Sequence, residues 1–423
     1  MGTILRRGTL ILLATLASAG CSRLPDGVSR PDLGAETHGH RYHAASGRVL
    51  YLQGEYPHKT YFCVYDGLTG AIQKVHVDDY RLIDSDYAYL PREHEAVLPV
   101  KFRPSEDAED HVYVPNATGN LLNVRGPDKK ALAADRLLHV STRDGSIIKE
   151  MPLAKDASLA ALSRPAWSDR VFIVINAQDK ALLKRYDPTK RAAEDAVPLG
   201  DFTIQAAAFS DSSPQMILDV RDAAKKPRLV VYDLKAGRIS KEASPPAGLD
   251  ALRASGARFL ASYSPSGEVK SIVADIDPQD ASVRRIAELD NGIESLALSN
   301  DRAWAVSRDA SHPQKADDRG FFPRLITLIG RDGSTEPVPW TKRDGELFGY
   351  DGRTQRLFFA ATQPAGVWTI SGDRKTLSAA ARELDRTAGE FPRSMKLLLI
   401  FMIVGSVVMG VLVRFMKFGG SDI

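Results

Sequence analysis

The sequence contains only two cysteines, Cys21 and Cys63, among its 423 residues. Two thiols are too few for a cysteine-ligated structural zinc or iron–sulfur site, and for the dense disulfide framework of small secreted domains. The motifs G-x-S-x-G and H-E-x-x-H and a phosphate-binding glycine loop are also missing. We therefore predict no cofactor, and no motif points to a catalytic residue.

A surplus of charge of one sign is also missing. Four of the 56 Lys and Arg residues and one of the 53 Asp and Glu residues lie in the terminal segments 1–20 and 397–423. Residues 21–396 therefore carry 52 basic and 52 acidic side chains. A general nucleic-acid-binding protein needs a basic surplus to neutralise phosphates, so we exclude nucleic acid as the partner.

The N-terminus has the pattern of a bacterial secretory signal peptide over residues 1–20. Two arginines and an apolar run of about a dozen residues precede Cys21, and this run is too short to span a membrane. Ser18-Ala19-Gly20-Cys21 resembles the lipobox of bacterial lipoproteins, except that Ser18 stands where an aliphatic residue is usual. The resemblance implies a lipid on Cys21. Cleavage after Ala17-Ser18-Ala19 by ordinary signal peptidase is the alternative.

The fate of Cys21 decides the role of the other cysteine. A lipidated Cys21 leaves Cys63 as a small core residue in the strand-like stretch YFCVYD. A free Cys21 in an oxidising compartment permits a Cys21–Cys63 disulfide instead. The sequence favours the lipid, because a polar, proline-containing stretch follows Cys21. Residues 21–44 are predicted to form a flexible linker.

The C-terminus contains one long apolar run without charge, LLLIFMIVGSVVMGVLV at 397–413. As a helix it covers about 25 Å, and the basic residues on either side extend its reach toward a bilayer core of about 30 Å. We predict a transmembrane helix there. A juxtamembrane stalk at 378–396, helical over Ser378–Arg386, precedes it. A cytoplasmic tail at 414–423 follows, and its basic residues fit the positive-inside rule.

Between these ends the chain repeats one plan, best seen in LVVYDLKAGRISK at Leu229–Lys241. A β-branched and aromatic run ends in Tyr-Asp, a turn with Asp, Gly or Pro follows, and a second strand begins. A second motif, in which Ser, Asp or Gly lies between two apolar strands, precedes most of these turns. One example is LALSNDRAW at Leu296–Trp304. Each unit therefore has four strands. The turns centre near residues 67, 144, 188, 236, 278, 332 and 373.

Units of about 40–50 residues with four strands each are typical of β-propellers. The amino-acid sequence of the repeats resembles that of TolB-type and WD40-type β-propellers, above all at LALSNDRAWAV. The resemblance implies no specific family. The resemblance implies an all-β propeller of about seven four-stranded blades at 45–377. We expect Arg48–Gln53 to close the ring by completing the sheet begun by Leu357–Ala361.

The first two turns lie 77 residues apart, which indicates either a degenerate unit or an insertion. The charged stretch Pro91–Asp110 within this gap reads as a long loop, followed by a hairpin turn at Asn116–Gly119. Two stacked β domains divided in the 91–110 loop are the alternative architecture. An α/β fold is disfavoured because long helical patterns are missing before residue 376.

The densest cluster of candidate metal ligands is His38-Gly-His40-Arg-Tyr-His43, with three of the nine histidines. Imidazoles this close suit zinc or copper. However, Glu36 is the only obvious carboxylate beside them, so we interpret the segment as a surface loop rather than a metal site. We predict no catalytic or cofactor-binding residue, and Cys21 is the predicted lipidation site.

These observations predict a β-propeller anchored in the bacterial inner membrane, facing the periplasm and working by binding. We expect a scaffold subunit of a cell-envelope assembly for secretion, polymer export or envelope biogenesis, with envelope proteins as partners. A free catalyst has little need to be fixed at both ends. Two alternatives remain: a hydrolase or lyase acting on envelope glycans through channel carboxylates, and a ligand sensor that signals through a partner membrane protein.

Overall fold

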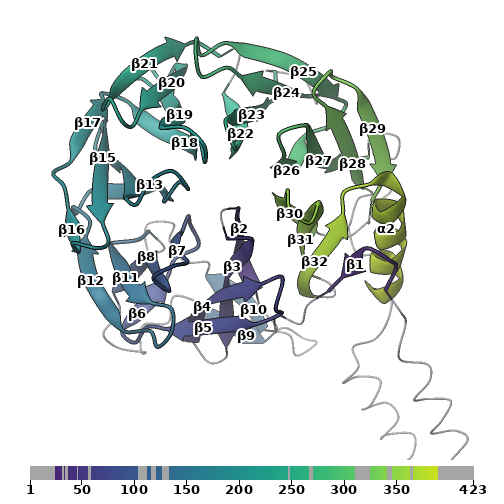
Figure 1. The fold of residues 1–423 in the computed structure, drawn as a ribbon, viewed down its shortest axis with the longest axis horizontal. Helices are drawn as coiled ribbons and strands as arrows, with labels where there is room; N and C mark the ends of the chain where they lie inside the picture. The colour runs from purple at the N-terminus through teal and green to yellow at the C-terminus, as the bar shows by residue number, and fades with distance from the viewer. Residues whose placement is uncertain are drawn as a thin grey trace, which may run out of the picture.

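Seven antiparallel sheets form a ring in the part of the chain that the structure describes (Figure 1). The structure is a computed structural model, and it describes residues 24–388 except 31–32, 34–36, 45, 56–58, 103–111, 116–120, 126–132, 246–247, 266–269, 310–323, 341–344 and 363–364. We call each sheet a blade. In most blades four consecutive strands pair in sequence order from the centre outward. The predicted all-β, seven-bladed ring is confirmed, and the alternative of two stacked β domains is wrong.

The blades are numbered along the chain, and the strands of each blade run in order from the centre outward. Blade 1 contains β2 (Thr37–His43), β3 (Arg48–Glu55), β4 (Lys59–Asp66) and β5 (Ile72–His76). Blade 3 contains β13 (Ala157–Ser163), β14 (Val171–Ala177), β15 (Lys180–Asp187) and the outer pair β16 (Ala192–Ala193) and β17 (Val197–Gly200). Blade 4 contains β18 (Thr203–Phe209), β19 (Gln215–Arg221), β20 (Pro227–Asp233) and β21 (Arg238–Ala243).

Three further blades complete the ring beyond blade 4. Blade 5 contains β22 (Leu249–Ser255), β23 (Arg258–Tyr263), β24 (Ser271–Ile276) and β25 (Val283–Leu289). Blade 6 contains β26 (Ile293–Leu298), β27 (Arg302–Arg308), β28 (Arg324–Gly330) and β29 (Thr335–Pro339). Blade 7 contains β30 (Gly345–Asp351), β31 (Arg356–Thr362), β32 (Ala365–Ser371) and β1 (Val28–Ser29).

Blade 2 explains the wide gap between the first two turns, because it carries an insertion. Its strands are β6 (Tyr80–Leu82), β7 (Ala88–Leu90), β8 (Glu95–Phe102), β11 (Arg136–Ser141) and β12 (Ile147–Pro152). Between β8 and β11 lies a separate two-stranded sheet of β9 (Val112–Pro115) and β10 (Leu121–Arg125), whose pairing agrees with the predicted hairpin. The interpretation of 91–110 as one long loop is wrong at β8, whose buried stretch pairs with β11 along its length.

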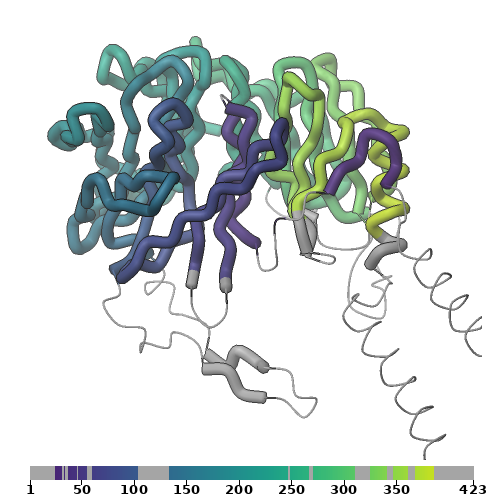
Figure 2. The backbone as a smooth tube through the Cα atoms, turned by 60° about the horizontal axis from the view of Figure 1, so that its bottom comes forward, coloured from purple at the N-terminus to yellow at the C-terminus, as the bar shows by residue number. Residues whose placement is uncertain are grey.

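The ring is closed by the N-terminal strand β1, which forms the outer edge of blade 7. Val28 pairs with Ile370 and Ser29 with Thr369 of β32, and Figure 2 shows β1 beside the last strands of the chain. The expected closure by Arg48–Gln53 is therefore wrong, because that stretch lies in β3, between β2 and β4 of its own blade. Strands β1 and β2 also lie within 21–44, the segment expected to be a linker.

Aspartate side chains shape the outer turn of each repeat, as the sequence predicts. In blade 4 the Asp233 carboxylate accepts hydrogen bonds from the N–H groups of Lys235 and Ala236, at 2.9 and 2.8 Å. Gly237 then adopts a φ of 69°, which glycine permits without strain, and its N–H donates to the Asp233 carbonyl. Similar side-chain bonds form at Asp66, Asp187, Asp277 and Asp332.

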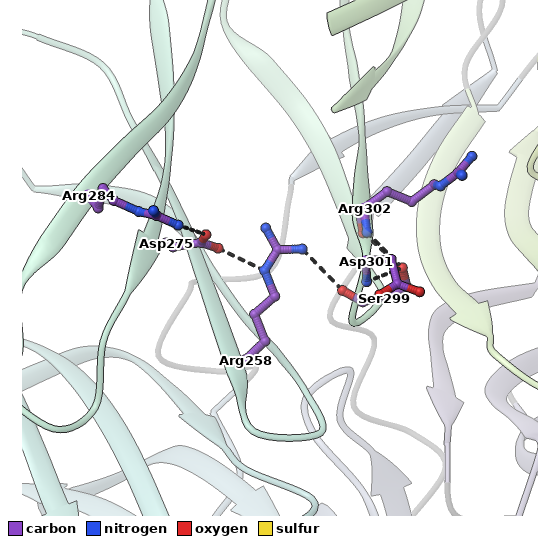
Figure 3. A network of polar contacts seen from close by, with 6 residues as sticks. All are labelled: Arg258, Asp275, Arg284, Ser299, Asp301 and Arg302. Carbon is purple, nitrogen blue, oxygen red and sulfur yellow. Dashed lines mark hydrogen bonds and ion pairs between the residues drawn. The ribbon is translucent and has the colours of Figure 1, made fainter. Parts of the chain in front are cut away.

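A serine shapes the inner turn of blade 6 and links it to blade 5. The Ser299 hydroxyl accepts hydrogen bonds from the N–H groups of Asp301 and Arg302 (Figure 3). The Ser299 carbonyl accepts a hydrogen bond from Arg258 of blade 5 at 3.2 Å, and Arg258 also donates to Asp275 at 2.8 Å. The serine in the repeated phrase LALSND thus ends one hairpin and fastens it to the preceding blade.

The hydrophobic core is divided among the boundaries between neighbouring blades. Blades 3 and 4, for example, bury Val174 and Leu183 against Met216 and Leu218. The boundary between blades 6 and 7 is the most aromatic, and it buries the side chains of Trp304, Trp340 and Trp368. Each blade therefore depends on both neighbours for its stability, so the ring has to be complete to be stable.

Helix α2 (Arg374–Ala388) covers the outer rim of the ring beside β29 and β32 (Figure 1). Asp373 caps it by accepting the Thr376 N–H at 2.9 Å, and its buried face includes Leu377 and Leu384. The helix thus begins before the stretch Ser378–Arg386 and packs onto the ring. Among the described residues we find no helix that is long and apolar enough to cross a membrane. The predicted span at 397–413 lies outside them.

Candidate functional site: the central channel

The innermost strands of the blades surround a central channel with a cavity volume of about 410 Å³. Each of the seven blades contributes lining residues, from β2, from the segment before β7, and from β13, β18, β22, β26 and β30 (Figure 1). A cavity of this size lies within the range of small-molecule sites, which is about 300–1,000 Å³. Side chains far apart in the sequence meet in this channel, so we take it as the candidate binding site.

A β-bulge in the innermost strand of most blades turns side chains toward the channel. The register shifts by one residue between Leu249 and Ala251 of blade 5 and between Leu347 and Gly349 of blade 7, and likewise in blades 1, 3, 4 and 6. A bulge bends the strand and re-aims its side chains. In blade 7 it places Phe348 in the channel lining.

Hydrogen bonds from the preceding blade hold several of these bulged strands in place. The Asn176 side chain of blade 3 exchanges two hydrogen bonds, both 2.9 Å, with the backbone of Ile204 in blade 4. The Ser295 hydroxyl of blade 6 accepts the N–H of Leu347 in blade 7 at 3.1 Å. Most of the channel wall is therefore built on strands that neighbouring blades hold in place, which favours a preorganised site.

The three histidines of the candidate metal cluster all lie on β2, at the first blade's inner edge. His38 is exposed, whereas His40 is 4% exposed and stacks on Phe348 with ring centres 5.3 Å apart. His43 lines the channel and shares a 2.8 Å hydrogen bond with the Ser46 hydroxyl. We find no group of three or more His, Cys, Asp or Glu with metal-binding geometry among the residues that the structure describes.

Both channel histidines are neutral at pH 7. Burial, with help from His38 and Arg41, lowers the pKa of His40 to about 4. Burial, with help from Arg164 and Arg48, lowers the pKa of His43 to about 4. Neutral imidazoles leave this side of the channel without a histidine charge at pH 7.

Charged side chains of both signs also line the channel, and they come from different blades. Arg41 of blade 1 forms an ion pair with Asp86 of blade 2 at 3.5 Å. Arg253 of blade 5 is exposed to the channel, and its one hydrogen bond among the described residues goes to the Leu252 carbonyl at 3.1 Å. Burial and Arg41 lower the pKa of Arg253, while Asp86 and Glu346 act in the opposite direction.

The rim of the channel carries a second set of charged groups, from blades 3 and 4. Arg164 lines the channel, its Nε is buried without a hydrogen-bond partner among the described residues, and its nearest described carboxylate is Asp169 at 3.5 Å. Asp211 also lines the channel, and burial raises its pKa. Neither residue stood out in the sequence, because each is one charge in a turn and only the ring brings the two to the same channel.

A second polar cluster resembles a catalytic relay but lies outside the channel. His139 is buried between blades 2 and 3, where its Nδ1 meets the Tyr186 hydroxyl at 2.7 Å and its Nε2 meets Glu95 at 2.8 Å. Tyr186 is fully buried, and none of these three residues lines the channel. The cluster therefore joins two blades through hydrogen bonds. A second cavity, of about 340 Å³, lies on blade 6 beside Arg302 and Glu336.

Cysteine placement bears on the two alternatives left open at the N-terminus. Cys63 is fully buried in β4, in the cluster that joins blades 7 and 1 through Tyr51 and Phe358. This is the environment expected of a core cysteine. Cys21 lies outside the described residues, so both its predicted lipidation and the alternative disulfide stay predictions.

Comparison with known proteins supports the fold and gives no family. No family model and no curated protein matches this chain. The β-propeller domain of Cps50 (Swd1) from Myceliophteria thermophila is 11% identical, with a TM-score of 0.52 over 82% of this chain and 100% of that one. This chain is a β-propeller. The β-propeller domain of the Trilobed protease from Pyrococcus furiosus, described as having an open velcro topology, is 13% identical, with a TM-score of 0.51 over 81% and 97%.

At these identities the likeness extends to the fold alone, because propellers serve many unrelated functions. The comparisons therefore assign no role to this chain.

Proposed function

We propose that this protein is a membrane-anchored binding propeller of the bacterial envelope, a scaffold subunit that faces the periplasm. The observation that carries the proposal is that the first and the last described elements, β1 and α2, both lie against blade 7. Strand β1 pairs with β32, and helix α2 packs beside β29 and β32 on the same rim (Figure 1). Leu24 packs against the same hydrophobic cluster as α2.

The lengths of chain beyond these contacts support anchoring at this rim. Cys21 precedes Leu24 by three residues, which reach at most about 10 Å, and Leu397 follows Ala388 by nine residues, which reach at most about 30 Å. A lipid on Cys21 and a span at 397–413 would therefore hold the same side of the ring toward one membrane. The other blades and the channel would stay accessible to partners.

Double anchoring favours a fixed place in an assembly over a freely diffusing catalyst. Gentle solubilisation and affinity purification of the tagged full-length protein, with mass spectrometry, tests this. We expect a recurring set of envelope proteins in near-stoichiometric amounts. An unrelated tagged membrane protein purified in the same detergent serves as the control, because proteins that merely share the micelle should appear with it as well. Full-length protein recovered alone would contradict the scaffold role.

The charged channel supports a second candidate function, that of a ligand sensor. Arg253 and Glu346 face a cavity of about 410 Å³ that scaffolding alone does not require. In this function a partner membrane protein would receive the signal that the propeller generates when its channel is filled. Recovery of the protein with one membrane partner, in an amount that changes when a channel ligand is added, would support the sensor over the scaffold.

A further inference from the structure

The channel lining holds two charges of opposite sign, Arg253 and Glu346, that are not joined by an ion pair. Arg253 has no described carboxylate within ion-pair distance, and among the described groups its guanidinium donates only to the Leu252 carbonyl. Glu346 is exposed to the channel and has no described Lys, Arg or His within ion-pair distance. The two residues still influence one another, because the Glu346 carboxylate raises the pKa of Arg253.

The rim repeats this arrangement with another pair of charges. The Asp169 carboxylate that meets Arg164 is 96% exposed, so water screens this ion pair, while the Nε of Arg164 stays buried without a described partner. Asp211 is half-buried, and among the described residues no cation lies within ion-pair distance of its carboxylate. The four residues lie in or beside the inner strands of blades 3, 4, 5 and 7, which hold them apart.

A ligand of a single charge does not fit this lining. An anion that binds Arg253 would come close to Glu346 and Asp86, and a cation that binds Glu346 would come close to Arg253. A ligand charge that lies close to a side chain of the same sign is repelled by it. A ligand with an anionic group near Arg253 and a cationic group near Glu346 would therefore pair both charges at once.

We propose that the channel binds a ligand carrying both an anionic and a cationic group. A carboxylate or phosphate would face Arg253, and an ammonium or guanidinium would face Glu346. The aromatic side chains of Phe348 and Tyr87 also line the channel and would contact the apolar part between the two charges. This proposal rests on the binding role proposed above, but not on the membrane anchor or on envelope partners.

A homologous series of ω-amino acids from glycine to 6-aminohexanoate tests the proposal. Its members differ only in the length of the carbon chain that separates the two charges. Saturation-transfer NMR on the full-length protein in detergent micelles detects binding in the millimolar range. We expect one or two chain lengths to bind about tenfold more tightly than the carboxylate and the alkylamine of the same length. The proposal would be overturned if no ω-amino acid in the series bound more tightly than the carboxylate and the alkylamine of the same length.

Two substitutions assign the two ends of the ligand. Arg253→Gln should reduce binding of the best ω-amino acid to that of the alkylamine, and Glu346→Gln should reduce it to that of the carboxylate. Arg374→Gln and Glu336→Gln are matched controls, since these residues form a 3.1 Å ion pair outside the channel. Binding that survives both channel substitutions, or that is lost equally in the controls, would contradict the assignment.

Short peptides with one Lys and one Glu at several spacings identify the source of the two charges. Tighter binding of a peptide than of every ω-amino acid would indicate a polypeptide segment, and the reverse would indicate a free small molecule. This outcome is separable from the scaffold proposal. A protein that binds the ligand but purifies alone would support the channel proposal and contradict the scaffold. A partner-bound protein with an inert channel would support the scaffold and contradict the channel proposal.

Discussion

Asp219 is a buried carboxyl group that works against the stability of the fold. It lies on β19, facing blade 5, and is 1% exposed. No hydrogen bond of normal geometry reaches either of its carboxylate oxygens among the described residues. Burial raises its pKa to about 6, and Arg221 opposes the shift only in part. The unfolded chain has an aspartate pKa of about 3.9, so the folded state binds the proton more tightly.

This difference predicts a loss of stability as the pH rises from about 4 to about 6, because the unfolded state binds fewer protons across that window. Two pKa units correspond to roughly 2–3 kcal/mol. Asp219→Asn removes the buried charge, so we expect a higher free energy of unfolding at pH 7 and little change at pH 4. Urea unfolding at both pH values measures this.

Asp275 provides the matched control, since it accepts hydrogen bonds from Arg258 at 2.8 Å and from Arg284 at 3.2 Å (Figure 3). Removing this charge leaves Arg258 without its ion-pair partner, so Asp275→Asn should destabilise the fold at pH 7. If both variants were destabilised equally at pH 7, the account of Asp219 would be wrong.

His139 makes the opposite contribution, because its polar contacts are satisfied. Truncating it would leave the buried Tyr186 hydroxyl without its partner and open a cavity between blades 2 and 3. We expect His139→Ala to destabilise the fold by roughly 2–4 kcal/mol, measured by urea unfolding. His38→Ala, at an exposed position of β2, should leave stability within about 0.5 kcal/mol. Equal losses of stability in His139→Ala and His38→Ala would contradict a structural role for His139.

At the scale of elements, the role of β1 in closing the ring could not be predicted from the sequence. This strand consists of two residues, Val28 and Ser29, and so short a strand leaves no periodic pattern. The side chains of Ser29 and Thr369 share a hydrogen bond across the pair. The closure of the ring therefore joins positions 340 residues apart.

This pairing predicts that a Ser29→Cys, Thr369→Cys double variant forms a disulfide under oxidising conditions. The bond would close a very long loop, for which the chain-entropy view gives a gain of up to about 5 kcal/mol. Non-reducing electrophoresis should show a faster-migrating band, and thermal unfolding should shift upward only without reductant. Cysteines at Leu50 and Leu357, which represent closure through β3, should not cross-link. The reverse pattern would contradict the observed closure.

The outer turns were the most predictable elements, because the chemistry of a turn is local. Asp233 and Gly237 fix their turn through contacts within a few residues. Strands β2 and β8 were missed for the opposite reason. The sequence HGHRYH alternates poorly, and Glu95–Phe102 contains a proline and precedes an acidic run. Their β structure depends on pairing with β3 and β11, which no local pattern reveals.

At the scale of the whole molecule, the ring follows from the repeats but its channel does not. Arg253, Glu346 and Arg164 each look like an ordinary surface charge in the sequence. Only the circular arrangement of blades brings them into one cavity, and that arrangement depends on bulges and closure that act over long distances. The sequence therefore predicts the blade count well and the candidate site poorly.

In the proposed function, the two ends of the chain hold the ring against a membrane. Blade 7 carries both β1 and α2, so a lipid and a span would act on one rim. The account requires the propeller to lie in the periplasm and the tail after residue 413 to lie in the cytoplasm.

Cysteine accessibility tests this central claim most directly. Leu68 is 79% exposed in the outer turn of blade 1, and Ser421 lies in the predicted tail. We predict that a membrane-impermeant maleimide labels Leu68→Cys in cells whose outer membrane alone is permeabilised, while Ser421→Cys reacts only after the inner membrane is broken. Wild-type protein gives the background from Cys21 and Cys63. Labelling of both positions before lysis, or of neither, would contradict an anchored propeller that faces the periplasm.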